Sequence, residues 1–323
     1  MQYDRDGFPI PPAFDPPADR ESFGNGFGWG GGKTQPAPPP GIPGSVPGRQ
    51  PKTRKRAWLL LLVAAGLVPA VVVPEVMPAV RQGIVEWALE RAAVREAGED
   101  VPGAIADLGT ALYWHGDDPD LLCMRALLRL EDRDAAGAIE DATQAAMQAP
   151  LSPQPARVRA LAAVVAGNVG MALADAGMVV DLSAPGDPEA LNHRAYIRAL
   201  VGRELPAALE DIERAIGTLG ESSPELLDTR GFILHLLDRQ AEAIDQLNLA
   251  IDAMQQNRRQ LRLLSGRMER SELIRRMRAL DRGLAVMLHH RALACAEAGL
   301  VEQAAQDGEL ARKKGFDPAR GIF

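Results

Sequence analysis

The sequence predicts an all-α solenoid of about six helix-turn-helix repeats, preceded by one transmembrane helix and a disordered N-terminal tail. Three observations support this fold class. Hydrophobic residues make up 46% of the 323 residues but aromatic residues only 4%, so Ala and Leu, strong helix formers, must supply most of the core. One short pattern recurs six times between residues 91 and 307. An uncharged apolar stretch precedes the first copy of that pattern.

Residues 1–56 are predicted to be a disordered tail. The segment is rich in Pro and Gly and cannot bury enough apolar surface to offset the entropy of its chain. Its glycines at 26, 28 and 31 match a dinucleotide-binding pattern, and residues 32–34 resemble the end of a phosphate-binding loop. However, no strand precedes these motifs and a proline-rich run follows them, so we expect no nucleotide site.

Residues 57–80 are predicted to form the transmembrane helix. Residues 57–73 are uncharged, and at 1.5 Å per residue they span about 25 Å, close to the ~30 Å hydrocarbon core of a bilayer. A buried core helix is the alternative. The basic cluster Lys52–Arg56 lies directly before the span, so the positive-inside rule predicts a cytoplasmic tail and an extracytoplasmic repeat domain. For a bacterium, this places the chain in the inner membrane with its repeats in the periplasm.

Residues 81–323 contain the repeated pattern. An Arg followed by Ala or Gly is followed, about twelve residues later, by an Ala-x-x-Asp or Ala-x-x-Gln segment. Copies begin 34 to 36 residues apart, except that 61 residues separate the last two. The six copies begin at Arg91, Arg125, Arg159, Arg194, Arg230 and Arg291, and their second halves begin at Ala104, Ala138, Ala172, Ala208, Ala243 and Ala304.

The period near 34, with small residues at Ala126, Ala138 and Ala145 and a closing Pro150, resembles the tetratricopeptide-repeat (TPR) family. The resemblance covers roughly residues 85–318, although the aromatic positions of the family are mostly Leu, Val or Ala here. It implies that each repeat is a pair of antiparallel helices, that stacked pairs share one continuous core, and that the concave groove binds a protein or peptide.

The recurring Arg and Asp allow two interpretations. The resemblance suggests that the Arg of the first helix pairs with the Asp of the second, for example Arg125 with Asp141 and Arg194 with Asp211. Such bidentate pairs fix geometry more than they add stability. The alternative is a charged ladder that binds a partner.

An insertion of about 27 residues, at about 258–284, separates the fifth and sixth repeats. It is rich in arginine, and we expect the flanking helices to extend into a hairpin that turns near Ser265 and Gly266. The hairpin either packs on acidic repeat surfaces or contacts an acidic protein, RNA or anionic headgroups. The candidate basic patch comprises Arg258, Arg259, Arg262, Arg275 and Arg276.

By register with Ala126, several first-helix residues are candidates for the partner-binding groove. Tyr196 and Phe232 belong to this set because aromatic residues often anchor interfaces. Both could instead pack on a neighbouring repeat. The candidate groove residues are Asn192, Tyr196, Asp228, Phe232 and His289.

We expect no enzymatic activity, cofactor or metal. His289 and His290 are adjacent on a predicted helix, so their rings diverge and cannot share a metal ion. Cys123 and Cys295 are expected to be buried and unbridged. The net charge of −7 argues against nucleic-acid binding.

These features predict a membrane-anchored TPR scaffold for protein–protein interaction in envelope assembly or secretion. The alternative is a regulatory membrane protein that relays or localises a signal through its tail and repeats. The sequence leaves the identity of the partner and the oligomeric state open.

Overall fold

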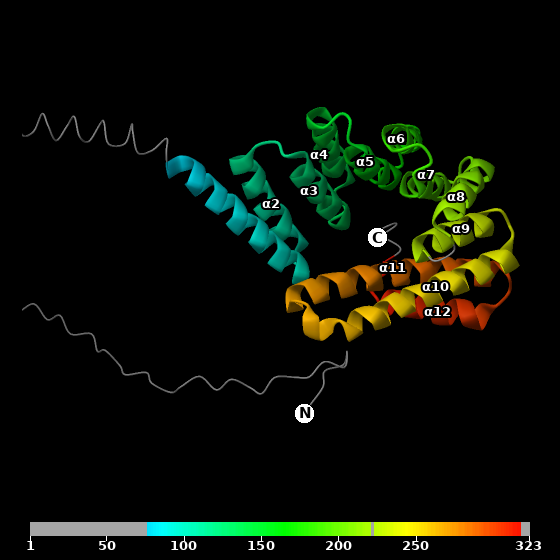
Figure 1. Ribbon diagram of the computed structural model, residues 1–323. Helices are drawn as coiled ribbons and strands as arrows, with labels where there is room; N and C mark the ends of the chain where they lie inside the picture. Colours follow the sequence, from blue (N-terminus) through cyan, green and yellow to red (C-terminus); the bar gives the residue numbers. More distant parts are fainter. Residues whose placement is uncertain (1–75, 221–222, 318–323) are drawn as a thin grey trace, which may run out of the picture. The chain divides into compact units, whose positions relative to one another are not determined.

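The structure is a computed structural model that describes residues 76–220 and 223–317, and the described residues are helical except at the connections (Figure 1). The first described helix covers residues 76–97. The helices that follow are α2 (Val101–His115), α3 (Pro119–Glu131), α4 (Ala135–Gln148), α5 (Pro153–Val165), α6 (Val169–Leu182), α7 (Pro188–Leu200), α8 (Leu205–Leu219), α9 (Pro224–Leu236), α10 (Gln240–Leu263), the 3-10 turn η1 (Ser265–Arg267), α11 (Arg270–Glu297) and α12 (Val301–Lys313).

These helices stack as successive pairs, which confirms the predicted all-α solenoid. Helix 76–97 packs on α2, and each later odd-numbered helix packs on the even-numbered helix after it. The first helices of successive pairs also contact one another, from α3 and α5 through to α9 and α11. Figure 1 shows these first helices on the inner side of the curve that the pairs follow. The inner face of the solenoid is therefore built from first helices.

Short capping signals set where the first helices begin. Asp118 accepts hydrogen bonds from the backbone N–H groups of Asp120 and Leu121, and Pro119 occupies the first helical position of α3. α5, α7 and α9 begin in the same way, with a Ser or Asp cap followed by Pro. A side-chain oxygen satisfies an otherwise unpaired N–H, and proline needs no partner at that position. In these four repeats, the local sequence therefore specifies the residue at which the first helix begins.

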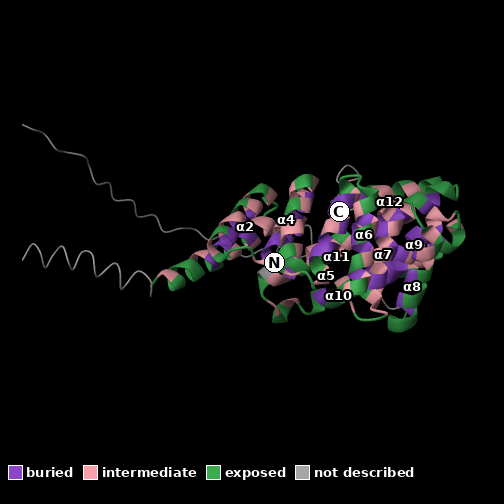
Figure 2. Ribbon diagram, turned by 90° about the horizontal axis from the view of Figure 1, so that it is seen from above, coloured by how far each residue is buried: buried purple, intermediate pink, exposed green. Residues whose placement is uncertain are grey.

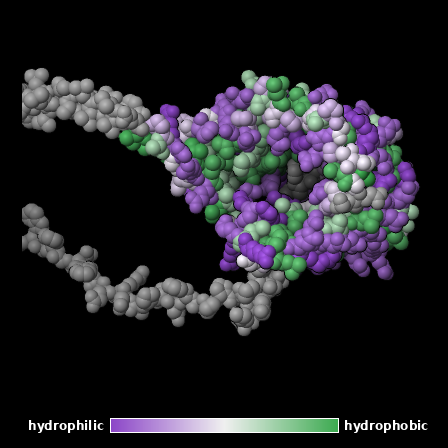
Figure 3. Space-filling model, viewed as in Figure 1, coloured by the Kyte–Doolittle hydropathy of each residue, from purple (hydrophilic) through white to green (hydrophobic). Residues whose placement is uncertain are grey.

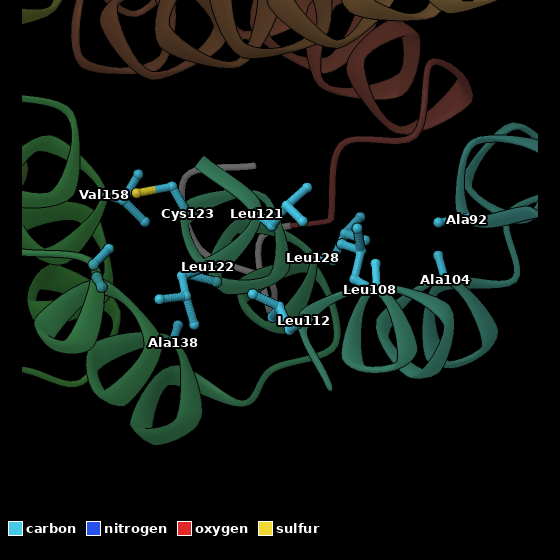
Figure 4. Packing of buried hydrophobic residues seen from close by; sticks show 14 of the residues in the cluster. Ala92, Ala104, Leu108, Leu112, Leu121, Leu122, Cys123, Leu128, Ala138 and Val158 are labelled. Atoms are coloured by element: carbon cyan, nitrogen blue, oxygen red, sulfur yellow. The ribbon is translucent and has the colours of Figure 1, made fainter. Parts of the chain in front are cut away.

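Alanine holds the two helices of each pair close together. The alanine that opens the second half of the pattern is fully buried in the first five copies, at Ala104, Ala138, Ala172, Ala208 and Ala243. Figure 4 shows the packing around two of them, with Ala92 facing Ala104 and Leu122 beside Ala138. In Figure 2 buried and exposed residues alternate along the helices, as expected for helices with one face in the core.

The fifth pair packs most tightly at Gly231. A Cβ atom built on this glycine would lie 2.6 Å from Leu247 Cγ and 3.2 Å from the carbonyl oxygen of Ala243. No real Cβ tolerates the first of these distances, so the side chain of Leu247 occupies the space that an alanine would need. This explains why the small residue of the fifth copy is Gly and not Ala.

The insertion lengthens two helices. α10 has 24 residues and α11 has 28, whereas the other helices from α2 to α12 have 13 to 15. The two long helices form a hairpin that turns through η1, which contains Ser265 and Gly266. Leu261 on α10 and Leu273 on α11 are buried, so each long helix keeps a buried apolar residue near the turn.

The expected tail and most of the expected transmembrane segment lie outside the described residues. Only residues 76–80 of that segment are described, and they belong to helix 76–97. Within the described ranges, no helix combines the length and the apolar character that crossing a membrane requires. The membrane span at 57–80 therefore stays a prediction.

Candidate partner-binding surface

The recurring arginine and aspartate pair within the repeats. Arg125 donates from Nε and Nη2 to the two carboxylate oxygens of Asp141, at 2.8 and 2.6 Å. Three further copies show the same bidentate pair, whereas in the first copy Arg91 Nη2 makes a single, longer contact with Asp107 Oδ1 at 3.4 Å. The three further pairs are Arg159–Asp175, Arg194–Asp211 and Arg291–Asp307.

The fifth copy departs from this arrangement because Gln246 replaces the aspartate. Arg230 donates to the Gln246 side chain at 3.3 Å and pairs with Glu213 of the preceding repeat at 2.8 Å. In the four bidentate copies the hydrogen bond to the carboxylate raises the pKa of the arginine, as for Arg125. The pairing of Arg with Asp inside the repeats is confirmed, so these charges hold the fold together and do not form a free ladder.

A second arginine contacts the same aspartate in three repeats. Arg95, Arg129 and Arg198 lie four residues after the recurring arginine, and each reaches the same carboxylate at 3.2, 3.1 and 2.6 Å respectively. Residues four apart share a helix face. A second Arg four residues after the recurring Arg therefore indicates this contact in the sequence. The repeat pattern described above did not include that second Arg.

The predicted groove residues Asp228 and Phe232 are buried, with 7% and 8% of their surfaces exposed. His290 of α11 covers both. Its imidazole stacks on the Phe232 ring with centroids 4.1 Å apart, and its Nδ1 lies 2.9 Å from an Asp228 carboxylate oxygen. Phe232 therefore packs on the neighbouring repeat, the alternative that the sequence left open. His290 was not among the candidates, since periodicity pointed to His289.

His289 lies beside this cluster but has a different neighbour. It is half-buried, and its ring stacks on Phe316 with centroids 4.2 Å apart. Burial and then the charge of His290 lower its pKa to about 4, so the ring is neutral near pH 7. The structure thus uses His289 to hold the segment after α12 against α11.

Asn192 and Tyr196 lie one turn apart on α7, a helix that Figure 1 shows on the inner side of the curve, and both residues are half-buried. The Tyr196 ring is close to Phe232 and His290, with centroids 6.4 and 6.2 Å away, and burial raises the pKa of its phenol. Figure 3 shows a hollow in the surface in this view, with hydrophobic and hydrophilic residues on its border. Tyr196 also packs against the buried cluster around Ala195 and Ile212.

Two polar atoms of α7 are buried without a hydrogen-bond partner among the described residues: Asn192 Oδ1 and His193 Nε2. Burial, and then the charge of Arg157 on α5, lowers the pKa of His193 to about 3, so this imidazole is neutral near pH 7. Arg157 also donates weakly to the carbonyl of Glu189, at 3.5 Å. α7, which contacts α5, thus contains buried polar atoms that have no hydrogen-bond partner among the described residues.

The predicted basic patch divides into paired and unpaired arginines. Arg258 pairs with Asp281 at 2.9 Å, and Arg275 and Arg276 both pair with Glu272. Arg259 and Arg262 are exposed, and within the described ranges no ion pair involves them. The hairpin therefore neutralises part of its own charge and leaves the rest in solvent.

Two arginines nearer the repeats bind the start of the array. Arg278 donates to the carbonyl oxygens of Glu96 and Ala97, at the C-terminal end of the first described helix. Arg282 pairs with Glu131 of α3 at 3.5 Å. A helix C-terminus carries partial negative charge, which favours a guanidinium there. The expected packing of the insertion on acidic repeat surfaces is thus found, but only for its repeat-proximal arginines.

Neither cysteine is bridged, and both are buried, as expected. Burial raises the pKa of Cys123 to about 11. Among the described residues, no group of three or more His, Cys, Asp or Glu side chains is arranged to hold a metal ion.

No protein-family model and no curated protein matches this sequence. Solved structures to which the chain is similar include TPR proteins. One from Thermus thermophilus is 19% identical, with 54% of this chain and 91% of that chain covered and a TM-score of 0.45. Another, from Parabacteroides merdae, is 16% identical, with 73% and 94% covered and a TM-score of 0.44. Such low scores carry no inference about a ligand or a function.

Proposed function

We propose that this chain is a membrane-anchored TPR scaffold that binds a protein or peptide segment on the inner face of its solenoid. Residues 57–80 anchor it, the tail lies in the cytoplasm, and the repeats lie on the other side of the membrane. In that position the scaffold serves envelope assembly or secretion.

The observation that supports a ligand on the inner face is the unpaired Asn192 Oδ1. A buried acceptor without a partner costs about 1–3 kcal/mol, and a donor from a ligand recovers that cost. By contrast, the recurring arginines and aspartates already have internal partners. Asn192 Oδ1, which lies on a first helix and has no hydrogen-bond partner among the described residues, therefore supports the inner face of α7 as the binding surface.

The surrounding side chains suit an extended peptide. A backbone N–H of the peptide can donate to Asn192, and the half-buried ring of Tyr196 offers apolar contact area one turn away. Among the described residues Arg157 makes one weak hydrogen bond, to the carbonyl of Glu189, so its guanidinium supplies a donor for a peptide carbonyl or carboxylate. These three residues come from two adjacent first helices, so a ligand that contacts them runs across the helices and not along one of them.

The membrane part of the proposal is supported by sequence alone. An uncharged stretch of about 25 Å follows a basic cluster, which is the usual arrangement at the cytoplasmic end of a span. Cutting the repeats with protease in cells whose outer layer is permeabilised tests it. Cleavage of the repeats with survival of a cytoplasmic control is the expected result, and protection until lysis contradicts the proposed orientation.

A photo-crosslinking amino acid placed at Asn192 in the full chain tests the binding surface. The matched control carries the same group at Met147, an exposed residue on α4, the second helix of its pair. In native membranes we expect a discrete adduct from position 192 that Tyr196→Ala weakens and that position 147 does not give. Equal adducts at both positions, or an adduct indifferent to Tyr196, would refute the inner-face surface.

A further inference from the structure

The tip of the α10–α11 hairpin combines free positive charge with exposed apolar side chains. Residues 258–282 contain nine arginines against three carboxylates, in a chain whose net charge is −7. The tip is therefore a basic region on an otherwise acidic protein, which neither helix formation nor repeat packing requires.

Four exposed arginines surround the turn without an ion pair from any described residue. They differ from the others of the insertion, which bind carboxylates or the carbonyls of helix 76–97. The four are Arg259, Arg262, Arg267 and Arg270. Since the paired arginines lie nearer the repeats or on one arm, the free charge is concentrated at the end of the hairpin.

Leucines lie between these arginines at the turn itself. Leu263 is 85% exposed and Leu264 is 45% exposed, although Leu261, two residues before Leu263, is buried. Ile274 on the opposite arm is 37% exposed. Exposing large aliphatic side chains to water is unfavourable. Their exposure beside four arginines therefore indicates a binding partner that is apolar and carries negative charge at its surface.

We propose that this tip docks on an anionic membrane surface. The arginines contact lipid headgroups, and Leu263 and Leu264 enter the boundary between the headgroups and the acyl chains. An acidic protein would satisfy the arginines but needs a matching apolar pocket for the leucines, whereas a bilayer offers both environments in one layer.

The length of the hairpin suits this role. α10 has 24 residues and α11 has 28, against 13 to 15 in the other helices from α2 to α12, so about ten additional residues on each arm extend the tip by roughly 15 Å at 1.5 Å per residue. If residues 57–80 anchor the chain, as the proposed function states, the tip is held near a bilayer at high effective concentration, and a weak contact suffices. The repeat domain outside the insertion has an excess of acidic residues and is repelled by anionic lipid, so docking through the tip also orients the repeats.

The test uses the full chain with Leu263→Cys, labelled with an environment-sensitive fluorophore. Cys123 and Cys295 are buried, so labelling is confined to the tip. The matched control carries the label at Met147→Cys. Both proteins are reconstituted into vesicles of phosphatidylcholine alone or mixed with phosphatidylglycerol, each containing a lipid-borne quencher. The label reports on the tip itself, however the rest of the chain is attached.

We expect quenching and a blue shift at position 263 in phosphatidylglycerol vesicles only, and no change at position 147. Arg259→Gln with Arg262→Gln should weaken the tip–lipid association about 30-fold, at about fivefold per arginine. High salt should act in the same direction. Equal quenching in both vesicle types overturns the proposal. So does a tip label that ignores anionic vesicles but responds to soluble polyglutamate, which would indicate an acidic protein partner instead.

Discussion

Asp141→Asn should destabilise its repeat more than Asp175→Asn destabilises the next one. Asp141 is 2% exposed, accepts two hydrogen bonds from Arg125, and forms an ion pair with Arg129 at 3.1 Å. Asp175 is equally buried but pairs with Arg159 alone. Both substitutions are isosteric and remove one negative charge. The two sites differ in how many arginines contact the aspartate, two at Asp141 and one at Asp175.

The magnitude follows from burial. Removing one partner of a fully buried pair costs about 3–5 kcal/mol, because the other charge is left uncompensated. The side chains of Arg125 and Arg129 keep 19% and 21% exposure, so water recovers part of that loss. We therefore expect about 3 kcal/mol for Asp141→Asn. For Asp175→Asn we expect about 2 kcal/mol, the value of a hydrogen-bonded contact to one charged group.

Guanidinium unfolding followed by circular dichroism measures the total loss, and hydrogen exchange locates it. Because a repeat array unfolds in neighbouring units, the loss of protection should centre on α3 and α4 for Asp141→Asn and on α5 and α6 for Asp175→Asn. Crosslinking at Asn192 should persist in both variants. Equal destabilisation by the two changes, or loss of the crosslink without loss of stability, would refute the structural role of the pairs.

Three further predictions address packing, protonation and thiol reactivity. Gly231→Ala should lower the free energy of unfolding by about 1–3 kcal/mol through overpacking. Gly217→Ala, at an exposed position of α8 with open space around it, should raise the free energy of unfolding by up to ~1 kcal/mol. Urea unfolding that shows a change of the same sign for both variants contradicts this prediction. Because the folded-state pKa of His193 is about 3 and the unfolded value 6.5, the unfolded chain takes up the proton first. Stability should therefore fall as the pH drops from 6.5 towards 3, by up to ~1.4 kcal/mol per unit, and His193→Gln should flatten this slope in unfolding titrations at several pH values. The thiols of Cys123 and Cys295 are buried and have raised pKa values, so mass spectrometry should detect alkylation only after denaturant is added, and rapid labelling of the folded chain would contradict their burial.

The helix pairs and their Arg–Asp contacts were predictable because they are local. A helix-turn-helix fixes the distance between Arg125 and Asp141, which are only 16 residues apart in sequence. The same is true of the helix starts, where Asp118 and Pro119 specify the cap and the first turn without any tertiary contact. Helix starts and contacts within one repeat can therefore be predicted from the sequence of that repeat alone.

Contacts across distant parts of the array were not predictable in the same way. Asp228 and His290 are 62 residues apart, and their contact depends on how α11 sits against α9 after a long insertion. The register from Ala126 correctly places Asp228 on the first helix of its repeat but cannot say what covers it. Similarly, Arg278 reaches carbonyls 181 and 182 residues away, which requires the accumulated curvature of every repeat between them.

Recurrence itself separates structural from functional polar residues in this chain. The recurring arginines bind the aspartate of their own repeat, or Gln246 in the fifth copy, and in three copies they also contact the second helix of the preceding repeat, so they join repeats as well as helices. These inter-repeat contacts are Arg159 with Thr143, Arg230 with Glu213 and Arg291 with Asn248. A polar residue that recurs in every repeat makes a structural contact in every repeat. A ligand that bound this residue would have to replace that contact. Asn192 Oδ1 and the tip arginines have no such use among the described residues, so we expect changes at these positions to weaken the proposed binding at little cost to stability.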